Sequence, residues 1–202
     1  MKVLSDFVLN YETFLFYPHH DDFGNLTTAV FGNQQSVLVG MKPTALIDFN
    51  LKYHGSSLEG ANAGAKAILG NVKMPPIVIN KTLGIYWLPM KSPSKADCVW
   101  LALHHVKDYS NAGEGRTKVI FTDGFSVTLE VSHYSFHKKV QRAYELKGKI
   151  DRRTRELEFL PGEQQSYLNE KISEYAFEAD LQMHFNHMKF GMGKLKFDGA
   201  ET

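Results

Sequence analysis

The chain has 202 residues, of which 43% are hydrophobic and 22% charged, and its formal net charge is +1. This composition is typical of a globular protein with a substantial core, and it excludes a low-complexity chain. No run approaches the roughly 18 apolar residues of a membrane helix. Asp6 and Glu12 interrupt the apolar run near the N-terminus, where a secretory signal would need an unbroken apolar block. The single cysteine, Cys98, excludes an internal disulfide framework. We therefore expect a cytoplasmic protein without a membrane partner.

The first third of the chain predicts a β-meander followed by helices. The runs ETFLFYP, NLTTAVF and SVLVG are rich in β-forming residues and are separated by turn-forming residues. PTALIDFNLKY has mixed periodicity and is compatible with a helix. In HGSSLEGANAGAK, Ser56 and Glu59 have the spacing of a capping box, which predicts a helix that Gly70 ends.

The middle of the chain predicts more strands. PPIVIN, GIYWLP and, after a polar loop, CVWLALHHVKDY read as strands. The strongest local signal is TKVIFTDGFSVTLEV, because two alternating runs are joined by Asp123 and Gly124, a pair suited to a tight hairpin turn.

A helix is predicted after this hairpin. Ser132 is a suitable N-cap, and Gly148 is expected to end the helix. The expected apolar face holds Phe136, Val140, Ala143 and Tyr144. Lys138, Arg142 and Lys149 are expected on the opposite side.

The order of elements predicts an α+β fold with a mainly antiparallel sheet, packed helices and a helical C-terminal appendage. We expect one domain over residues 1–161 and the appendage over residues 162–202, where an amphipathic stripe precedes a frayed tail.

A basic block interrupts the otherwise balanced charge. From residue 138 to residue 155 there are eight cations and two acids, a local charge of +6, whereas residues 156–202 hold nine acids and four bases. Such a block supplies sequence-independent affinity for the phosphates of DNA, and the alternative is a solvated helix face. The cations are Lys138, Lys139, Arg142, Lys147, Lys149, Arg152, Arg153 and Arg155. Lys73, Arg116 and Lys118 are weaker candidates.

Other chemistries have less support. A phosphate-binding P-loop needs Lys-Ser/Thr where Ala61 and Asn62 stand, and Cys98 lies in a predicted strand, where it reads as a small buried hydrophobe. The histidine pairs at residues 133/137 and 184/187 share helix faces but lack a third ligand. We therefore assign no catalytic residue, metal or cofactor, and expect a protein that is not an enzyme.

Four motifs together carry a family pattern. They are Gly-Ser-Ser-x-x-Gly from Gly55, Lys-x-Pro-Pro from Lys73, Cys-x-Trp from Cys98, and Ser-x-x-Ser-Phe-x-x-x-Val-x-Arg from Ser132. In this order and spacing the chain resembles the ComK family of competence transcription factors over roughly residues 13–161.

The resemblance implies an activator of genes for DNA uptake that binds double-stranded A/T-rich boxes as a homo-oligomer, largely through the minor groove. That fits the narrow, negative minor groove of A-tracts, which attracts arginine and lysine. It also implies a proteolytic adaptor that grips Phe159, Leu160 and Pro161 within LEFLP. The alternative is a protein-interaction module of the same fold that does not bind DNA productively.

Overall fold

The computed structural model describes residues 3–21, 23–32, 35–95 and 97–158. The chain divides into two units, residues 1–152 and 153–202, and both sheets, α1, α2 and most of α3 belong to the first. The strands are β1 (Val3–Leu4), β2 (Thr13–His20), β3 (Leu26–Gly32), β4 (Gln35–Val39), β5 (Ile77–Asn80), β6 (Ile85–Pro89), β7 (Trp100–Ala102), β8 (Val106–Asn111), β9 (Thr117–Phe121) and β10 (Ser126–Leu129). The helices are α1 (Pro43–Tyr53), α2 (Leu58–Leu69) and α3 (His133–Glu158), with a short 3-10 helix, η1 (Leu103–His105).

The strands form a seven-stranded sheet in the order β1-β4-β3-β2-β7-β6-β5 and a three-stranded sheet in the order β10-β9-β8. All pairs are antiparallel except β1 with β4. The predicted meander is confirmed as β2, β3 and β4, and the α+β class with a mainly antiparallel sheet is confirmed too. The expected appendage over residues 162–202 lies outside the described residues.

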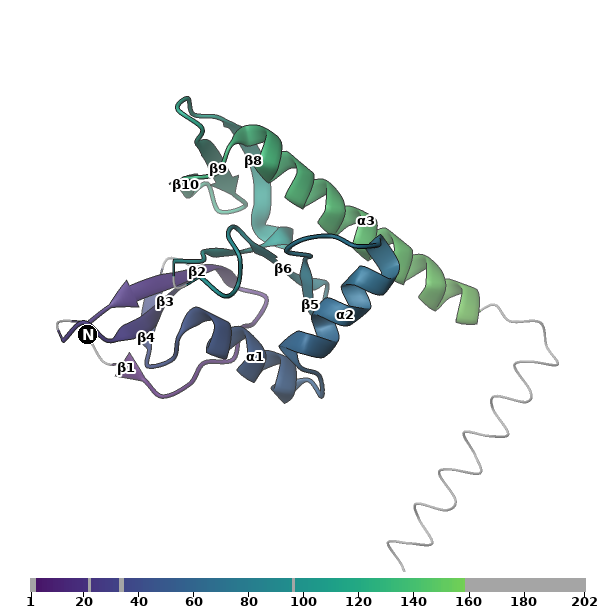
Figure 1. Ribbon diagram of the computed structural model, residues 1–202, viewed down its shortest axis with the longest axis horizontal. Coiled ribbons are helices and arrows are strands. Elements are labelled where there is room, and N and C mark those ends of the chain that lie inside the picture. The colour runs from purple at the N-terminus through teal and green to yellow at the C-terminus, as the bar shows by residue number, and fades with distance from the viewer. Residues whose placement is uncertain (1–2, 22, 33–34, 96, 159–202) are drawn as a thin grey trace, which may run out of the picture. The chain divides into compact units, whose positions relative to one another are not determined.

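The seven-stranded sheet separates two hydrophobic cores, because successive strand residues point to opposite faces. On one face Phe16, Trp87 and Trp100 pack with the buried residues of α1. On the other face Leu15 and Leu101 pack with the three-stranded sheet and α3. Figure 1 accordingly shows α1 and α3 on opposite sides of this sheet.

Helix α2 begins one residue later than the capping box predicts. Ser57 is the N-cap, because its backbone is extended and its Oγ accepts from the Gly60 N–H at 3.1 Å. Glu59 is then the second helical residue and is not the reciprocal partner of the cap, so the predicted Ser56/Glu59 box is wrong. Gly70 ends the helix with a φ of +84°, as expected.

The hairpin predicted at Asp123 and Gly124 is confirmed as β9 and β10, and Gly124 has a φ of +89°. CVWLALHHVKDY holds two strands, because η1 separates β7 from β8 and the chain passes there from one sheet to the other. Cys98 precedes β7 and lies buried, with its thiol 3.2 Å from the Lys91 carbonyl oxygen.

Helix α3 starts as predicted but continues past its predicted end. The Ser135 N–H donates to Ser132 Oγ at 3.3 Å, which caps the helix. Gly148 lies inside the helix, because Leu146 and Ile150 on either side pack against the core and hold the backbone helical. Tyr144 is 54% exposed and does not belong to the apolar face, where Leu146 is buried instead.

Candidate nucleic-acid interface

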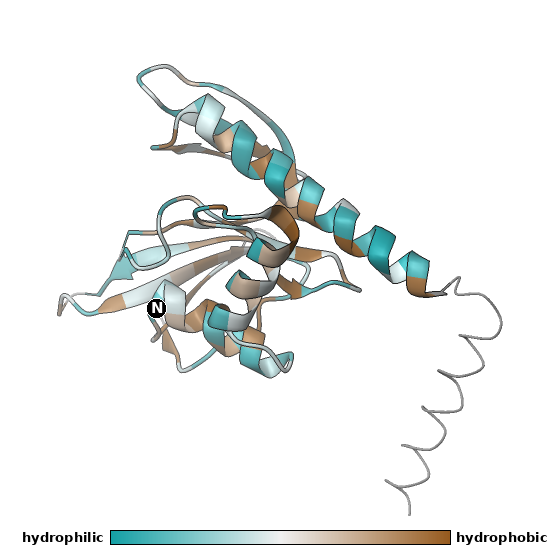
Figure 2. Ribbon diagram, turned by 45° about the vertical axis from the view of Figure 1, so that its right-hand side comes forward, coloured by the Kyte–Doolittle hydropathy of each residue, from teal (hydrophilic) through white to brown (hydrophobic). Residues whose placement is uncertain are grey.

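One side of α3 carries a row of cations. At about 100° per residue, Lys138, Arg142 and Lys149 fall within about 40° of one another around the helix. The first and last of them are 11 positions apart, which is about 16 Å along the helix. The buried side holds Phe136, Val140, Ala143 and Leu146, and Figure 2 shows hydrophilic residues along the rest of the helix. We name Lys138, Arg142 and Lys149 the cation row.

An aromatic ring lies at the N-terminal end of the cation row. Tyr134 is 71% exposed, and Lys138 Nζ lies 5.8 Å from its ring centroid. This distance allows a cation–π interaction, which orients the ammonium while leaving it accessible to an anion. Tyr134 was not among the residues predicted to bind, although its spacing of four residues from Lys138 on a helix is the signal that could have found it.

Carboxylates offset part of the basic block. Lys147 Nζ lies 2.8 Å from Asp151, and Lys149 Nζ lies 2.7 Å from Glu145. Lys149 Nζ also lies 3.3 Å from the Ile68 carbonyl oxygen in the last turn of α2. Both lysines remain partly exposed, so these pairs contribute little stability but lower the charge that an incoming phosphate meets.

Lys139 belongs to the core and not to the exposed block. Lys139 is only 9% exposed, and its Nζ donates to the Pro89 carbonyl oxygen at 2.7 Å. Burial is the main cause that lowers the pKa of Lys139. Lys139 therefore joins α3 to the end of β6, and its ammonium is not available to a phosphate in this structure.

The arginines of the block lie on helix, not in the loop that the sequence predicts after Gly148. Arg152 is exposed at the end of the first compact unit. Arg153 and Arg155 are exposed residues of α3 that belong to the second unit. The loop prediction is wrong because α3 continues to Glu158.

The weaker candidates lie apart from the cation row. Lys118 is exposed on β9, in register with Ser110 of β8 and Thr128 of β10. Its neighbour Val119 points into the core shared with α3, so Lys118 faces away from that helix. Arg116 pairs with Glu114 in the loop between β8 and β9.

Lys73 is exposed between α2 and β5. Phe159, Leu160 and Pro161, the expected adaptor contacts, lie outside the described residues.

Two neighbouring histidines join the N-terminal segment to η1. His104 Nε2 lies 2.9 Å from the Tyr11 carbonyl oxygen, and His105 Nε2 lies 2.5 Å from the same oxygen. His105 Nδ1 lies 2.8 Å from Thr122 Oγ1. Burial lowers the pKa of His104 to about 4 and also lowers that of His105, so both rings are neutral donors to Tyr11. The pair is a structural contact.

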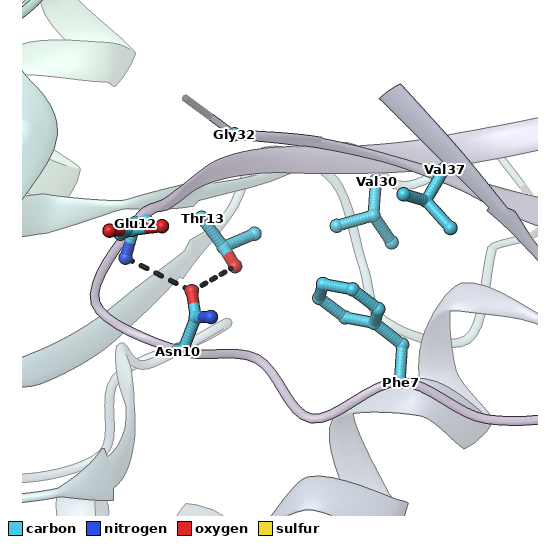
Figure 3. A pocket seen from close by; sticks show the side chains of 7 residues that line it. All are labelled: Phe7, Asn10, Glu12, Thr13, Val30, Gly32 and Val37. Atoms are coloured by element: carbon cyan, nitrogen blue, oxygen red, sulfur yellow. Dashed lines mark hydrogen bonds between the residues drawn. The ribbon is translucent and has the colours of Figure 1, made fainter. Parts of the chain in front are cut away.

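Figure 3 shows a pocket between the N-terminal segment and the strands β3 and β4. Its polar groups bind one another, since Asn10 Oδ1 accepts from the Glu12 N–H at 3.0 Å and from Thr13 Oγ1 at 3.1 Å. Gly32 is required beside it, because a Cβ there would lie 2.4 Å from the Glu12 carbonyl oxygen. We therefore assign no chemical role to this pocket.

The described histidines and Cys98 do not form a metal site or a reactive thiol. His137 Nδ1 lies 2.8 Å from the Tyr109 hydroxyl, and the His133 and His137 rings are 6.3 Å apart. Over the described ranges, no three or more His, Cys, Asp or Glu side chains gather as metal ligands. Burial raises the pKa of the Cys98 thiol, which disfavours a reactive thiolate. His184 and His187 lie outside the described residues.

Comparison with known proteins agrees with the sequence pattern. A family profile described as "ComK protein" matches residues 4–155. A relative named "Competence transcription factor", from Bacillus subtilis (strain 168), is 27% identical over 150 residues, which cover 74% of this chain and 78% of the relative. No solved structure matches significantly. Among the described helices, none is long and apolar enough to cross a membrane. Since the family profile matches most of its length, the chain belongs to the ComK family.

Proposed function

We propose that this protein is a DNA-binding transcription factor for competence genes, and that the cation row of α3 makes its principal contact with the phosphate backbone. The family membership and the relative's name support the role in transcription. The proposed phosphate contact rests on one observation. Lys138, Arg142 and Lys149 lie in a row along about 16 Å of one side of α3.

The chemistry of the cation row suits backbone binding. Lysine and arginine displace counterions from DNA, which gives affinity that falls as salt rises. Arg142 offers a planar guanidinium suited to two phosphate oxygens, and Lys138 offers a point charge held near Tyr134. Preference for A/T-rich boxes then arises from the narrow minor groove, which attracts such cations.

The proposal includes three further expectations. The protein acts in the cytoplasm as an activator, it carries out no catalytic step, and it works as a homo-oligomer on repeated boxes. Adaptor-controlled proteolysis through Phe159, Leu160 and Pro161 is part of the proposal on the family resemblance alone.

The ion pairs of Lys147 and Lys149 favour one alternative function. Because Lys147 and Lys149 already face Asp151 and Glu145, the basic block is weaker than its sequence suggests. A protein-interaction module of the same fold, without productive DNA binding, is consistent with that charge balance.

Binding of the purified full chain to A/T-rich and G/C-rich duplexes of equal length, over a series of salt concentrations, separates the two functions. The proposal expects tighter binding to the A/T-rich duplex and a linear fall of log affinity with log salt. Equal, weak binding to both duplexes at low salt would support the interaction module and contradict the proposal.

A further inference from the structure

The free edge of β10 lies beside an exposed apolar groove. The groove has a volume of about 410 Å³ and is bounded by β2, β3 and β10. Its lining residues are Leu15, Tyr17, Pro18, Phe31, Val99, Phe125, Val127 and Leu129, none of them charged. Tyr17 is 39% exposed and Phe125 is 40% exposed. Apolar surface of this kind beside an open strand is typical of an interaction site.

The hydrogen-bonding groups of β10 point in alternating directions. The Phe121 N–H donates to the Phe125 carbonyl at 2.8 Å, and the ladder from there to Thr117 and Leu129 is regular. Antiparallel pairs alternate between bonded and non-bonded, so Val127 bonds to β9, whereas the N–H and C=O groups of Ser126 and Thr128 point away from it. In the described part of the chain no strand pairs with β10 on that side.

Within the described residues, the other sheet edges are protected and the edge of β10 is not. Helix α2 packs on β5, the exposed residues Lys107 and Asp108 lie on β8, and β1 has only two residues. The four residues of β10 are Ser, Val, Thr and Leu, with no charge and no proline. Natural edge strands that stay unpaired usually carry a charged residue or a proline.

The edge is complementary to a second copy of itself. In an antiparallel pair centred on Val127, Ser126 of one copy faces Thr128 of the other, and both have outward N–H and C=O groups. The two-fold axis repeats the same pair of residues, with its hydrogen bonds, at the other end, because an isologous contact uses the same patch twice. No like charges face one another in this arrangement, since all four facing residues are uncharged.

We propose that β10 pairs with β10 of a second copy of this chain, joining two three-stranded sheets into one of six strands and covering the groove with apolar residues of the partner copy. Val127 and Leu129 point toward the groove, and Ser126 and Thr128 point to the other face of the sheet. The proposal does not depend on DNA binding.

The test introduces charged residues at two exposed positions of β10. The association of the full chain without DNA is then measured by sedimentation equilibrium. In Ser126→Lys/Thr128→Lys, lysines of two copies face each other, and in Ser126→Glu/Thr128→Glu, glutamates do. Each variant alone is expected to have a dimer dissociation constant raised about tenfold or more, and an equal mixture of the two is expected to associate again. Ser110→Lys, on β8 of the same sheet face, is the matched control and keeps the wild-type association.

Thr128→Pro provides a second variant, because it removes an N–H that points away from β9 and should spare the hairpin. It is expected to weaken association as well, with an unchanged far-ultraviolet circular dichroism spectrum. A wild-type chain that is monomeric at all concentrations would overturn the proposal, as would a lysine variant that associates like wild type. A dimer that fails to bind DNA would overturn the proposed function and leave this interface intact.

Discussion

Lys138 and Lys139 are neighbours in the sequence but lie in different environments. Lys138 is exposed beside Tyr134, whereas Lys139 is buried with its ammonium on the Pro89 carbonyl oxygen. The difference is a rotation of about 100° around α3, which turns one side chain to solvent and the other toward β6. The buried side of α3 holds the fold together, and the exposed side is left for binding. Local charge alone does not tell the two sides apart.

The largest effect is expected from the buried side. Phe136→Ala removes a fully buried ring that contacts Tyr109 at a centroid distance of 4.9 Å. We expect the free energy of unfolding to fall by about 3–5 kcal/mol, because the lost ring leaves a cavity between α3 and the three-stranded sheet. Chemical denaturation followed by circular dichroism measures this change. A loss below about 1 kcal/mol would mean that α3 is not docked on this core.

Lys139→Ala should separate stability from binding. The change removes a buried hydrogen bond to Pro89 and the packed side-chain stem, so we expect a loss of about 2 kcal/mol in unfolding free energy. The salt dependence of DNA binding should not change, because the ammonium is not accessible. Lys138→Ala is the matched control, with a stability change within about 0.5 kcal/mol. The reverse pattern would show that the two lysines have exchanged environments.

The histidine pair gives the fold a pH dependence with a definite sign. The pKa of His104 is lowered to about 4 from an ordinary value of 6.5, and that of His105 is lowered too. Between these values the unfolded chain binds more protons than the folded one, so stability is fully present above about pH 6.5 and falls toward pH 4. Denaturation at pH 7 and pH 5 should show this decrease. His104→Gln/His105→Gln should show a smaller one, and an equal decrease would exclude the histidines as its cause.

The smallest expected effect tests where the helix ends. Gly148→Ala should raise the free energy of unfolding by about 0.5–1 kcal/mol, because alanine favours a helix interior and open space surrounds the position. If Gly148 were instead the left-handed end of the helix, alanine would be destabilising. Thermal denaturation distinguishes the two signs.

Local signals predicted the elements well where sequence and backbone are directly linked. Asp123 and Gly124 indicated the hairpin, and Ser132 indicated the start of α3. Gly148 was misleading because its local preference to end a helix is outweighed by the packing of Leu146 and Ile150. The break between β7 and β8 had no local signal, since it depends on contacts of His104 and His105 with the distant Tyr11.

The candidate site was predictable only in part. The basic block is visible as composition, and helical phase correctly placed Lys138 and Arg142 away from Phe136. The burial of Lys139 was not predictable, because its partner carbonyl comes from β6, 50 residues earlier in the chain. The separation of Lys118 from α3 likewise depends on which face of the three-stranded sheet the helix covers.

We propose that the exposed side of α3 contacts DNA. The most direct test is the salt dependence of binding to an A/T-rich duplex for wild type, for Lys138→Ala/Arg142→Ala, and for Lys118→Ala as a control on the opposite side of the sheet. The double variant should bind more weakly, and its log–log salt slope should be smaller by about 2, because two phosphate contacts are lost. Lys118→Ala should keep the wild-type slope. An unchanged slope in the double variant, or the full loss in Lys118→Ala instead, would contradict the claim.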